Sequence, residues 1–115
     1  MTKTRDRDRD RWGYKYTEAI FEYLKPFAAR CETVFYKEVA DEFGTSERAL
    51  GGRELTAIQC ECDKHGWPHL NVLVVARKNG LPGSGYQPFK HLITRSEFEK
   101  KKLEVCDYDW TDKHL

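Results

Sequence analysis

Four side chains of the types that bind metal ions lie close together in this 115-residue sequence: Cys60, Cys62, His65 and His69. A structural zinc site uses cysteines separated by two to four residues, and two such pairs of ligands. Here a single residue separates the cysteines, and residues two apart on a helix point in nearly opposite directions. We therefore interpret Cys62 as a small core residue beside Ile58, and we expect neither a metal nor a cofactor.

The residues also lack the arrangement of a catalytic site. No Ser or Cys lies at a recognisable strained turn, and the segment GLPGSG (80–85) lacks the Lys-Ser/Thr ending of a phosphate-binding loop. The segment VVARK (74–78) has no carboxylate for a nuclease metal. The histidines are scattered and are each typical of a surface residue; they are His65, His69, His91 and His114. We therefore predict that the protein is not an enzyme.

Cysteine spacing and hydropathy indicate the cellular compartment. The four cysteines, at positions 31, 60, 62 and 106, do not show the spacing of a disulfide-stapled secreted domain. No apolar run approaches the ~20 residues that span a membrane, and none follows the basic N-terminus as in a signal peptide. We therefore expect a soluble, cytoplasmic protein that does not use a membrane as a partner.

Charge is distributed unevenly although the net charge is only +1. The stretch 77–102 holds two acidic residues, Glu97 and Glu99, and seven basic ones: Arg77, Lys78, Lys90, Arg95, Lys100, Lys101 and Lys102. Such a segment attracts polyanions, whereas a solvated face balanced by nearby acids is the alternative interpretation.

The chain divides into a charged arm and one domain. In residues 1–15 the segment TRDRDRDRW alternates charge without an apolar partner before Trp12, which is typical of a mobile arm. In residues 16–115 the aromatic residues supply a small core, and no second domain follows. In so small a domain most of Trp67, Tyr86 and Trp110 should be at least half buried.

Three helices are expected from apolar spacing and from their end signals. The first begins near Thr17, the second covers 36–43 and ends at Gly44, and the third covers 54–65 and ends at Gly66. Thr45 and Ser46 offer an N-cap between the last two. Thr94 and Glu97 form a possible capping box for a further short helix that ends at the lysine run.

The strand signals are shorter. Residues 33–35 favour a small strand, LNVLVVAR (70–77) favours the main strand, and Leu103 with Val105 favours a last one. Residues 80–88, GLPGSGYQP, must turn. This order predicts an α+β fold of winged helix-turn-helix type, with three helices and a small antiparallel sheet. A generic α+β domain is the alternative.

Three segments carry a family resemblance: TVFYKEVADEFG (33–44), SERALGG (46–52) and LVVARKNGLPGSGY (73–86). Together they resemble the C-terminal DNA-binding domain of alkylguanine-DNA alkyltransferases and of alkyltransferase-like proteins. The resemblance places Tyr36 in the family's tyrosine-containing helix and Arg48 at its base-displacing arginine. The chain is also similar to short uncharacterised bacterial and mobile-element proteins with a GLPGxG motif.

The chain departs from this family at the reactive site. In the family a reactive Cys, followed by His and Arg, immediately precedes the Val-Val pair. Here that stretch reads Leu70, Asn71, Val72 and Leu73, so no thiol accepts an alkyl group. The resemblance therefore implies DNA binding without alkyl transfer.

The candidate DNA contacts are Tyr36, Arg48 and Arg53 on helices, and Arg77, Lys78 and Lys90 as contacts to the DNA backbone. The helix region 47–64 is net negative, which weakens its approach to phosphates. We therefore expect a non-enzymatic accessory or regulatory DNA-binding protein. The alternative is a protein-interaction module, or an inhibitor of a larger host-defence or nucleic-acid-processing complex, which docks through Trp67, Tyr86 and Phe89. Steep salt dependence distinguishes DNA binding from the alternative.

Overall fold

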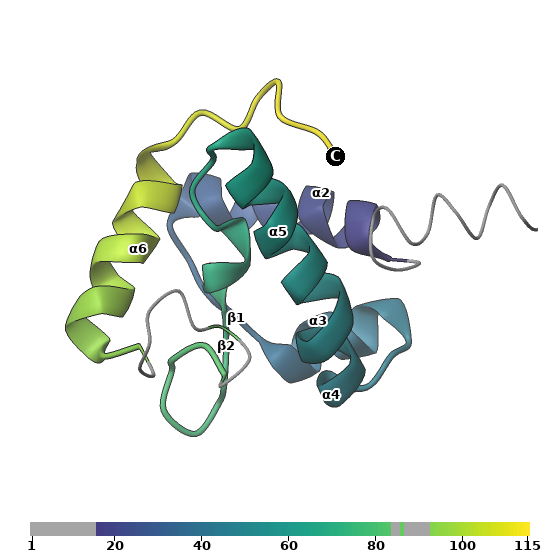
Figure 1. Ribbon diagram of the computed structural model, residues 1–115. Coiled ribbons are helices and arrows are strands. Elements are labelled where there is room, and N and C mark those ends of the chain that lie inside the picture. The colour runs from purple at the N-terminus through teal and green to yellow at the C-terminus, as the bar shows by residue number, and fades with distance from the viewer. Residues whose placement is uncertain (1–15, 84–85, 87–92) are drawn as a thin grey trace, which may run out of the picture.

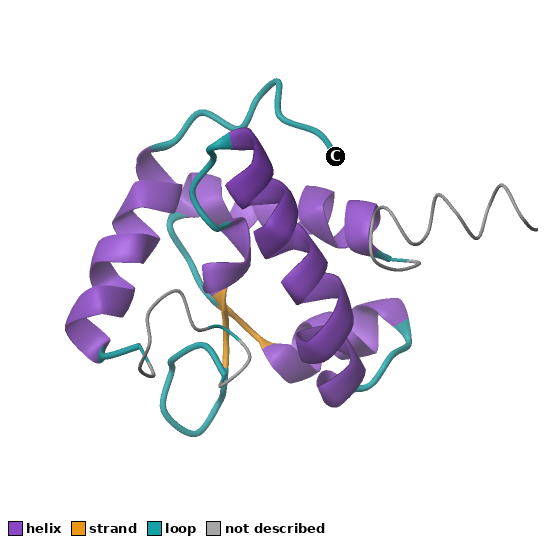
Figure 2. Ribbon diagram, viewed as in Figure 1, coloured by secondary structure: helices purple, strands orange, loops and turns teal. Residues whose placement is uncertain are grey.

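A computed structural model describes residues 16–83, 86 and 93–115 (Figures 1 and 2). The predicted arm 1–15, Phe89, Lys90 and His91 lie outside these residues. In chain order the elements are α2 (Thr17–Arg30), β1 (Val34–Phe35), α3 (Tyr36–Phe43), α4 (Glu47–Ala49), a π-helical turn (Leu50–Glu54), α5 (Leu55–His65), a 3-10 turn (Leu70–Leu73), β2 (Val74–Val75) and α6 (Arg95–Asp107).

The helix ends lie where the sequence signals place them. α3 and α5 end at Gly44 and Gly66, whose φ angles of 67° and 73° are left-handed and favour glycine. Ser46 caps α4, because its hydroxyl accepts a hydrogen bond from the Ala49 amide at 3.0 Å. Thr94 and Glu97 form the predicted capping box of α6.

α6 is longer than expected, and the predicted last strand at Leu103 and Val105 is wrong. The helix continues through the lysine run to Asp107. Phe98 and Val105 lie two helical turns apart and are both buried, which fixes one apolar face. Leu103 lies off that face and is 57% exposed. The short helix predicted after Thr94 is thus a helix of 13 residues.

The sheet of the described residues is parallel, so the prediction of an antiparallel sheet is wrong. Val34 pairs with Val74, and Phe35 pairs with Val75. β1 runs directly into α3, and α3 to α5 form the long crossover that returns the chain in the same direction, as a parallel pair requires. The α+β class is confirmed, and the winged helix stays a prediction.

The main predicted strand, 70–77, is only partly a strand. Leu70–Leu73 form a 3-10 turn, and β2 covers only Val74 and Val75. The turn is buried on all sides, because α2, α5 and α6 all pack against it. A fully apolar run does not distinguish a strand from a buried turn.

The core lies between α2, α5 and α6, around this turn (Figure 1). Cys62 is fully buried within it and Cys60 is exposed, as predicted. Trp110 is also buried, and its ring meets Phe21 edge-on at 5.8 Å between centroids. None of the described helices is long and apolar enough to cross a membrane.

Two of the four cysteines form a disulfide, although their spacing in the sequence is not that of a disulfide-stapled domain. Cys31, at the end of α2, forms a disulfide with Cys106, near the end of α6. The two residues are separated by 75 positions in the sequence but by 5.2 Å between Cα atoms. Sequence spacing does not reveal this pair, because the packing of the two helices creates it.

Candidate functional site

A hollow of about 460 Å³ opens between α3, the α4–π-turn region and the loop after β2. We call it the Tyr36 hollow. It is lined by Tyr36, Glu47, Arg48, Gly51, Gly52, Thr56, Ala76 and Gly83. The parts of the sequence that carry the family resemblance thus converge on one concavity, and α3 and α4 lie next to each other at that end of the molecule (Figure 1).

Tyr36 connects the two sides of this hollow. It is the first residue of α3, and its hydroxyl oxygen accepts a hydrogen bond from the Gly83 amide at 2.8 Å. Burial raises the pKa of Tyr36, so the phenol stays protonated at neutral pH. A Cβ atom at position 83 would lie 3.0 Å from the Tyr36 hydroxyl oxygen. Glycine at 83 therefore permits this close contact.

Arg48 lies on the wall of the hollow on α4, next to Glu47. Its side chain is exposed and has no ion-pair partner among the described residues. In the π-helical turn that follows, the Leu55 amide bonds to the Leu50 carbonyl five residues back. Such wide turns change the direction of the side chains around them and are frequent at functional sites.

Arg53, Arg77 and Lys78, the other predicted basic contacts among the described residues, do not line the hollow. The Arg53 guanidinium lies 3.7 Å from the carboxylate of Glu54, which is fully buried. The Arg77 guanidinium lies over the Phe35 ring, 4.6 Å from its centroid. Arg77 and Lys78 are exposed and directly follow Ala76, which does line the hollow. The structure thus brings Tyr36 and Arg48 together and leaves Arg53, Arg77 and Lys78 outside the hollow.

Of the alternative docking surface, Tyr86 belongs to the core and Trp67 packs against it, as expected from the small size of the domain. Trp67 is half-buried and stacks on the His65 ring at 4.3 Å between centroids. Tyr86 is only 3% exposed. Its hydroxyl lies 2.9 Å from His69 Nδ1. Neither ring is displayed as an exposed anchor.

His69 is not the surface residue that its sequence context suggested. Its side chain is 11% exposed, and its Nε2 lies 2.6 Å from the Asp63 carboxylate. Together with the Tyr86 contact, this forms a chain of hydrogen bonds from the end of α5 into the interior.

Gln59 and Asn71 are further polar residues that sequence reasoning did not select. Asn71 Nδ2 donates to Gln59 Oε1 at 3.2 Å. Both residues border a cavity of about 10 Å³ that also involves Tyr36 and Tyr86. The available signal was a single amide within the otherwise apolar run LNVLVV (70–75).

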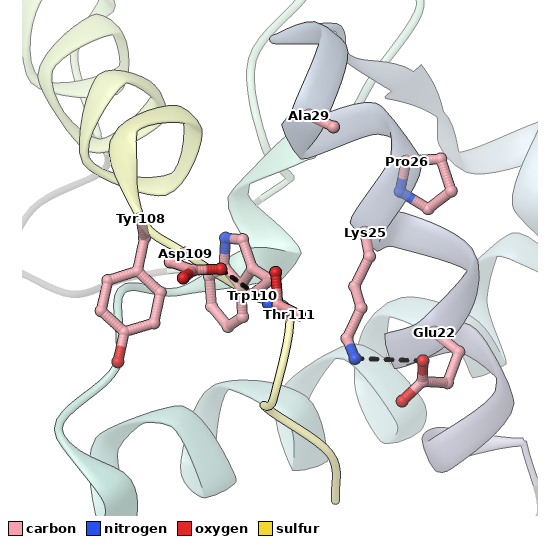
Figure 3. A pocket seen from close by; sticks show the side chains of 8 residues that line it. All are labelled: Glu22, Lys25, Pro26, Ala29, Tyr108, Asp109, Trp110 and Thr111. Atoms are coloured by element: carbon pink, nitrogen blue, oxygen red, sulfur yellow. Dashed lines mark hydrogen bonds and ion pairs between the residues drawn. The ribbon is translucent and has the colours of Figure 1, made fainter.

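A second hollow, of about 510 Å³, lies between α2 and the segment that follows α6 (Figure 3). One side carries Glu22 and Lys25, whose charged groups are 3.1 Å apart, and His114 Nδ1 lies 2.7 Å from the same carboxylate. Partial burial acts to raise the pKa of Glu22, but hydrogen bonds from His114 and Lys25 outweigh it and lower that pKa. Glu22, Lys25 and His114 pair with one another, so among the described residues this hollow has fewer unpaired polar groups for a ligand than the Tyr36 hollow has.

Comparisons with models of protein families, with curated proteins and with solved structures found no match. Within the described ranges, no three His, Cys, Asp or Glu side chains gather closely enough to hold a metal ion. The candidate site therefore rests on the structure alone. The site is a concave surface whose described lining includes one exposed guanidinium and three glycines.

Proposed function

We propose that this chain is a non-enzymatic accessory or regulatory protein that binds DNA at the Tyr36 hollow. The observation that carries the proposal is the convergence of Arg48 and Tyr36 on one concave surface. Arg48 matches the family's base-displacing arginine, and Tyr36 lies in the segment that resembles its tyrosine-containing helix.

The chemistry of the hollow suits a nucleic acid. Gly52 has no side chain, and a Cβ atom there would meet nothing within 4 Å, so a ligand can approach the backbone closely at that point. The Arg48 guanidinium can donate to phosphate oxygens or to a base edge. The volume of about 460 Å³ accommodates one base but is much too small for a duplex. DNA would therefore present an unpaired or displaced base to it.

Arg77 and Lys78 supply the electrostatic part of the proposal. They are exposed and begin the turn that follows β2, directly after a residue of the hollow. Lysine and arginine contacts to phosphates provide most of the affinity of sequence-independent binding. A protein-interaction module is less favoured, because Tyr86 belongs to the core and Trp67 packs against it.

The test is a titration of labelled single- and double-stranded DNA, followed by fluorescence anisotropy at low and at physiological salt. We expect binding that weakens steeply with salt, and we expect Arg48→Ala to lower the affinity about tenfold. Arg30→Ala is the matched control, because Arg30 is also an exposed arginine but does not line the hollow.

Charge reversal of the basic turn, by Arg77→Glu with Lys78→Glu, should weaken binding more than Arg48→Ala does, because two phosphate contacts become repulsive. Absence of binding at low salt would refute DNA binding. Equal affinities of the Arg48→Ala and Arg30→Ala variants would refute the assignment of the hollow.

A further inference from the structure

A buried amide oxygen lies behind the Tyr36 hollow without a hydrogen-bond partner. Asn71, in the 3-10 turn, is 4% exposed, and its Oδ1 accepts no hydrogen bond from the described residues. Buried acceptors are nearly always satisfied in folded proteins, because leaving one unpaired is costly. An unpaired buried acceptor beside a candidate binding site points to a ligand that donates the missing hydrogen bond.

The position of Asn71 relative to the hollow follows from shared walls. Asn71 borders the small cavity of about 10 Å³, together with Tyr36, Gly51, Leu55, Thr56, Gln59 and Tyr86. Tyr36, Gly51 and Thr56 also line the hollow. The cavity and the hollow therefore share a wall, which these three residues form.

The hydrogen bonds of the cavity leave one acceptor available. Asn71 Nδ2 is used by Gln59, and the Thr56 hydroxyl donates to the Gly51 carbonyl at 3.1 Å. The Tyr86 hydroxyl is bonded to His69. What remains is Asn71 Oδ1, which requires a donor. The cavity has about the volume that a single water-sized polar group needs.

We propose that Asn71 is a specificity-determining residue that selects an unpaired nucleobase bearing an exocyclic amino group. The proposal rests on the DNA binding proposed above. With the base in the Tyr36 hollow, its amino group enters the small cavity and donates a hydrogen bond to Asn71 Oδ1. A base with a carbonyl at the same place brings two acceptors together, and a base with only hydrogen there leaves Oδ1 unpaired.

The experiment compares short duplexes that differ at one mispaired position. That position carries adenine, unsubstituted purine, which lacks the amino group, or hypoxanthine, which has a carbonyl in its place. We expect the protein to bind the adenine duplex about tenfold more tightly than either of the others. Anisotropy measures the affinities. A duplex with 2-aminopurine at the same position reports by its fluorescence whether the base leaves the stack.

Two variants of similar shape separate hydrogen bonding from packing. Asn71→Leu removes the acceptor, so the preference for adenine over purine should fall to about one. Asn71→Asp keeps acceptor oxygens, and Gln59 can rotate its amide to donate to the new carboxylate, so the preference should remain. Thermal melting of each variant shows whether it is folded under the conditions of the titration.

The outcomes distinguish this inference from the proposed function. Absence of binding to any duplex at low salt refutes the DNA-binding function and the inference with it. Binding without a preference for adenine leaves the function standing and refutes the role of Asn71. A preference for adenine that survives Asn71→Leu also refutes the role of Asn71. A preference for hypoxanthine refutes it as well, because the Asn71 amide would then present its N–H group to the base.

Discussion

At position 36 one hydroxyl group joins two segments that lie 47 residues apart. The Tyr36 oxygen accepts from the Gly83 amide, and this contact holds the glycine-rich loop against α3. An amide that loses a buried acceptor costs free energy even when the ring that carried the acceptor remains. The hydroxyl at this residue is therefore part of what shapes the hollow.

We expect Tyr36→Phe to lower the free energy of unfolding by about 1 kcal/mol, because the Gly83 amide loses its acceptor. Tyr23→Phe is the control, since Tyr23 packs between Phe27 and Phe43 through its ring. Burial raises the pKa of Tyr36 above its usual value of 10.0, so its contribution to stability is complete below pH 10 and declines as the pH rises further. Denaturant titrations at neutral and at alkaline pH should show the free energies of unfolding of the unmodified protein and of Tyr36→Phe becoming more alike as the pH rises. A difference that does not change with pH would contradict this expectation.

At the scale of elements, local sequence signals predicted the helix ends, whereas the features that depend on long-range packing could not be predicted from the sequence. Gly44, Gly66, Ser46 and Thr94 were read correctly because helix ends depend on neighbouring backbone groups. The parallel pairing of β1 with β2 depends on a crossover of three helices, which no local pattern encodes. The run after Leu70 reads as a strand because burial on every side removes the alternation that would reveal its conformation.

The candidate site divides in the same way. Tyr36 and Arg48 were selected from the family resemblance, and the structure places them on one concavity. Asn71 was passed over, because an amide within an apolar run reveals nothing about which of its atoms will find a partner. Hydrogen-bond satisfaction is a property of the packed structure, so it becomes visible only there.

The capping box of α6 yields a prediction about that helix. Thr94→Ala should lower the free energy of unfolding by about 1 kcal/mol, because the Glu97 amide loses the Thr94 hydroxyl, which lies 3.2 Å away. Ser96→Ala serves as the control, since Ser96 is exposed in the first turn of the same helix. Chemical denaturation followed by circular dichroism measures both. Equal losses for the two variants would show that the cap contributes nothing specific.

Over the whole molecule, the Cys31–Cys106 bond joins the end of α2 to the end of α6. Most of the core helices and the Tyr36 hollow lie within the loop that it closes. The bond reduces the entropy of the unfolded chain, and for a loop of this length the stabilisation is about 4 kcal/mol. It therefore supplies a substantial part of the stability of so small a protein.

Reduction of this bond should shift the denaturant midpoint to a lower concentration, by an amount that corresponds to about 4 kcal/mol. The paired substitution Cys31→Ser with Cys106→Ser should unfold at that lower midpoint whether or not a reductant is present. Cys60→Ser should respond to reductant as the unmodified protein does, because Cys60 is free and exposed. A midpoint that reductant leaves unchanged would show that the bond contributes little.

The same bond also determines how a mechanical load passes through the chain. A force applied to the two ends of the described chain enters α2, crosses at the sulfur atoms of Cys31 and Cys106, and leaves through the segment after α6. The covalent ring between these cysteines, with β1, α3, α5 and the Tyr36 hollow inside it, lies outside that path. In a single-molecule pulling experiment the oxidised protein would lengthen only by the segments outside the ring. The reduced protein would extend along its full contour.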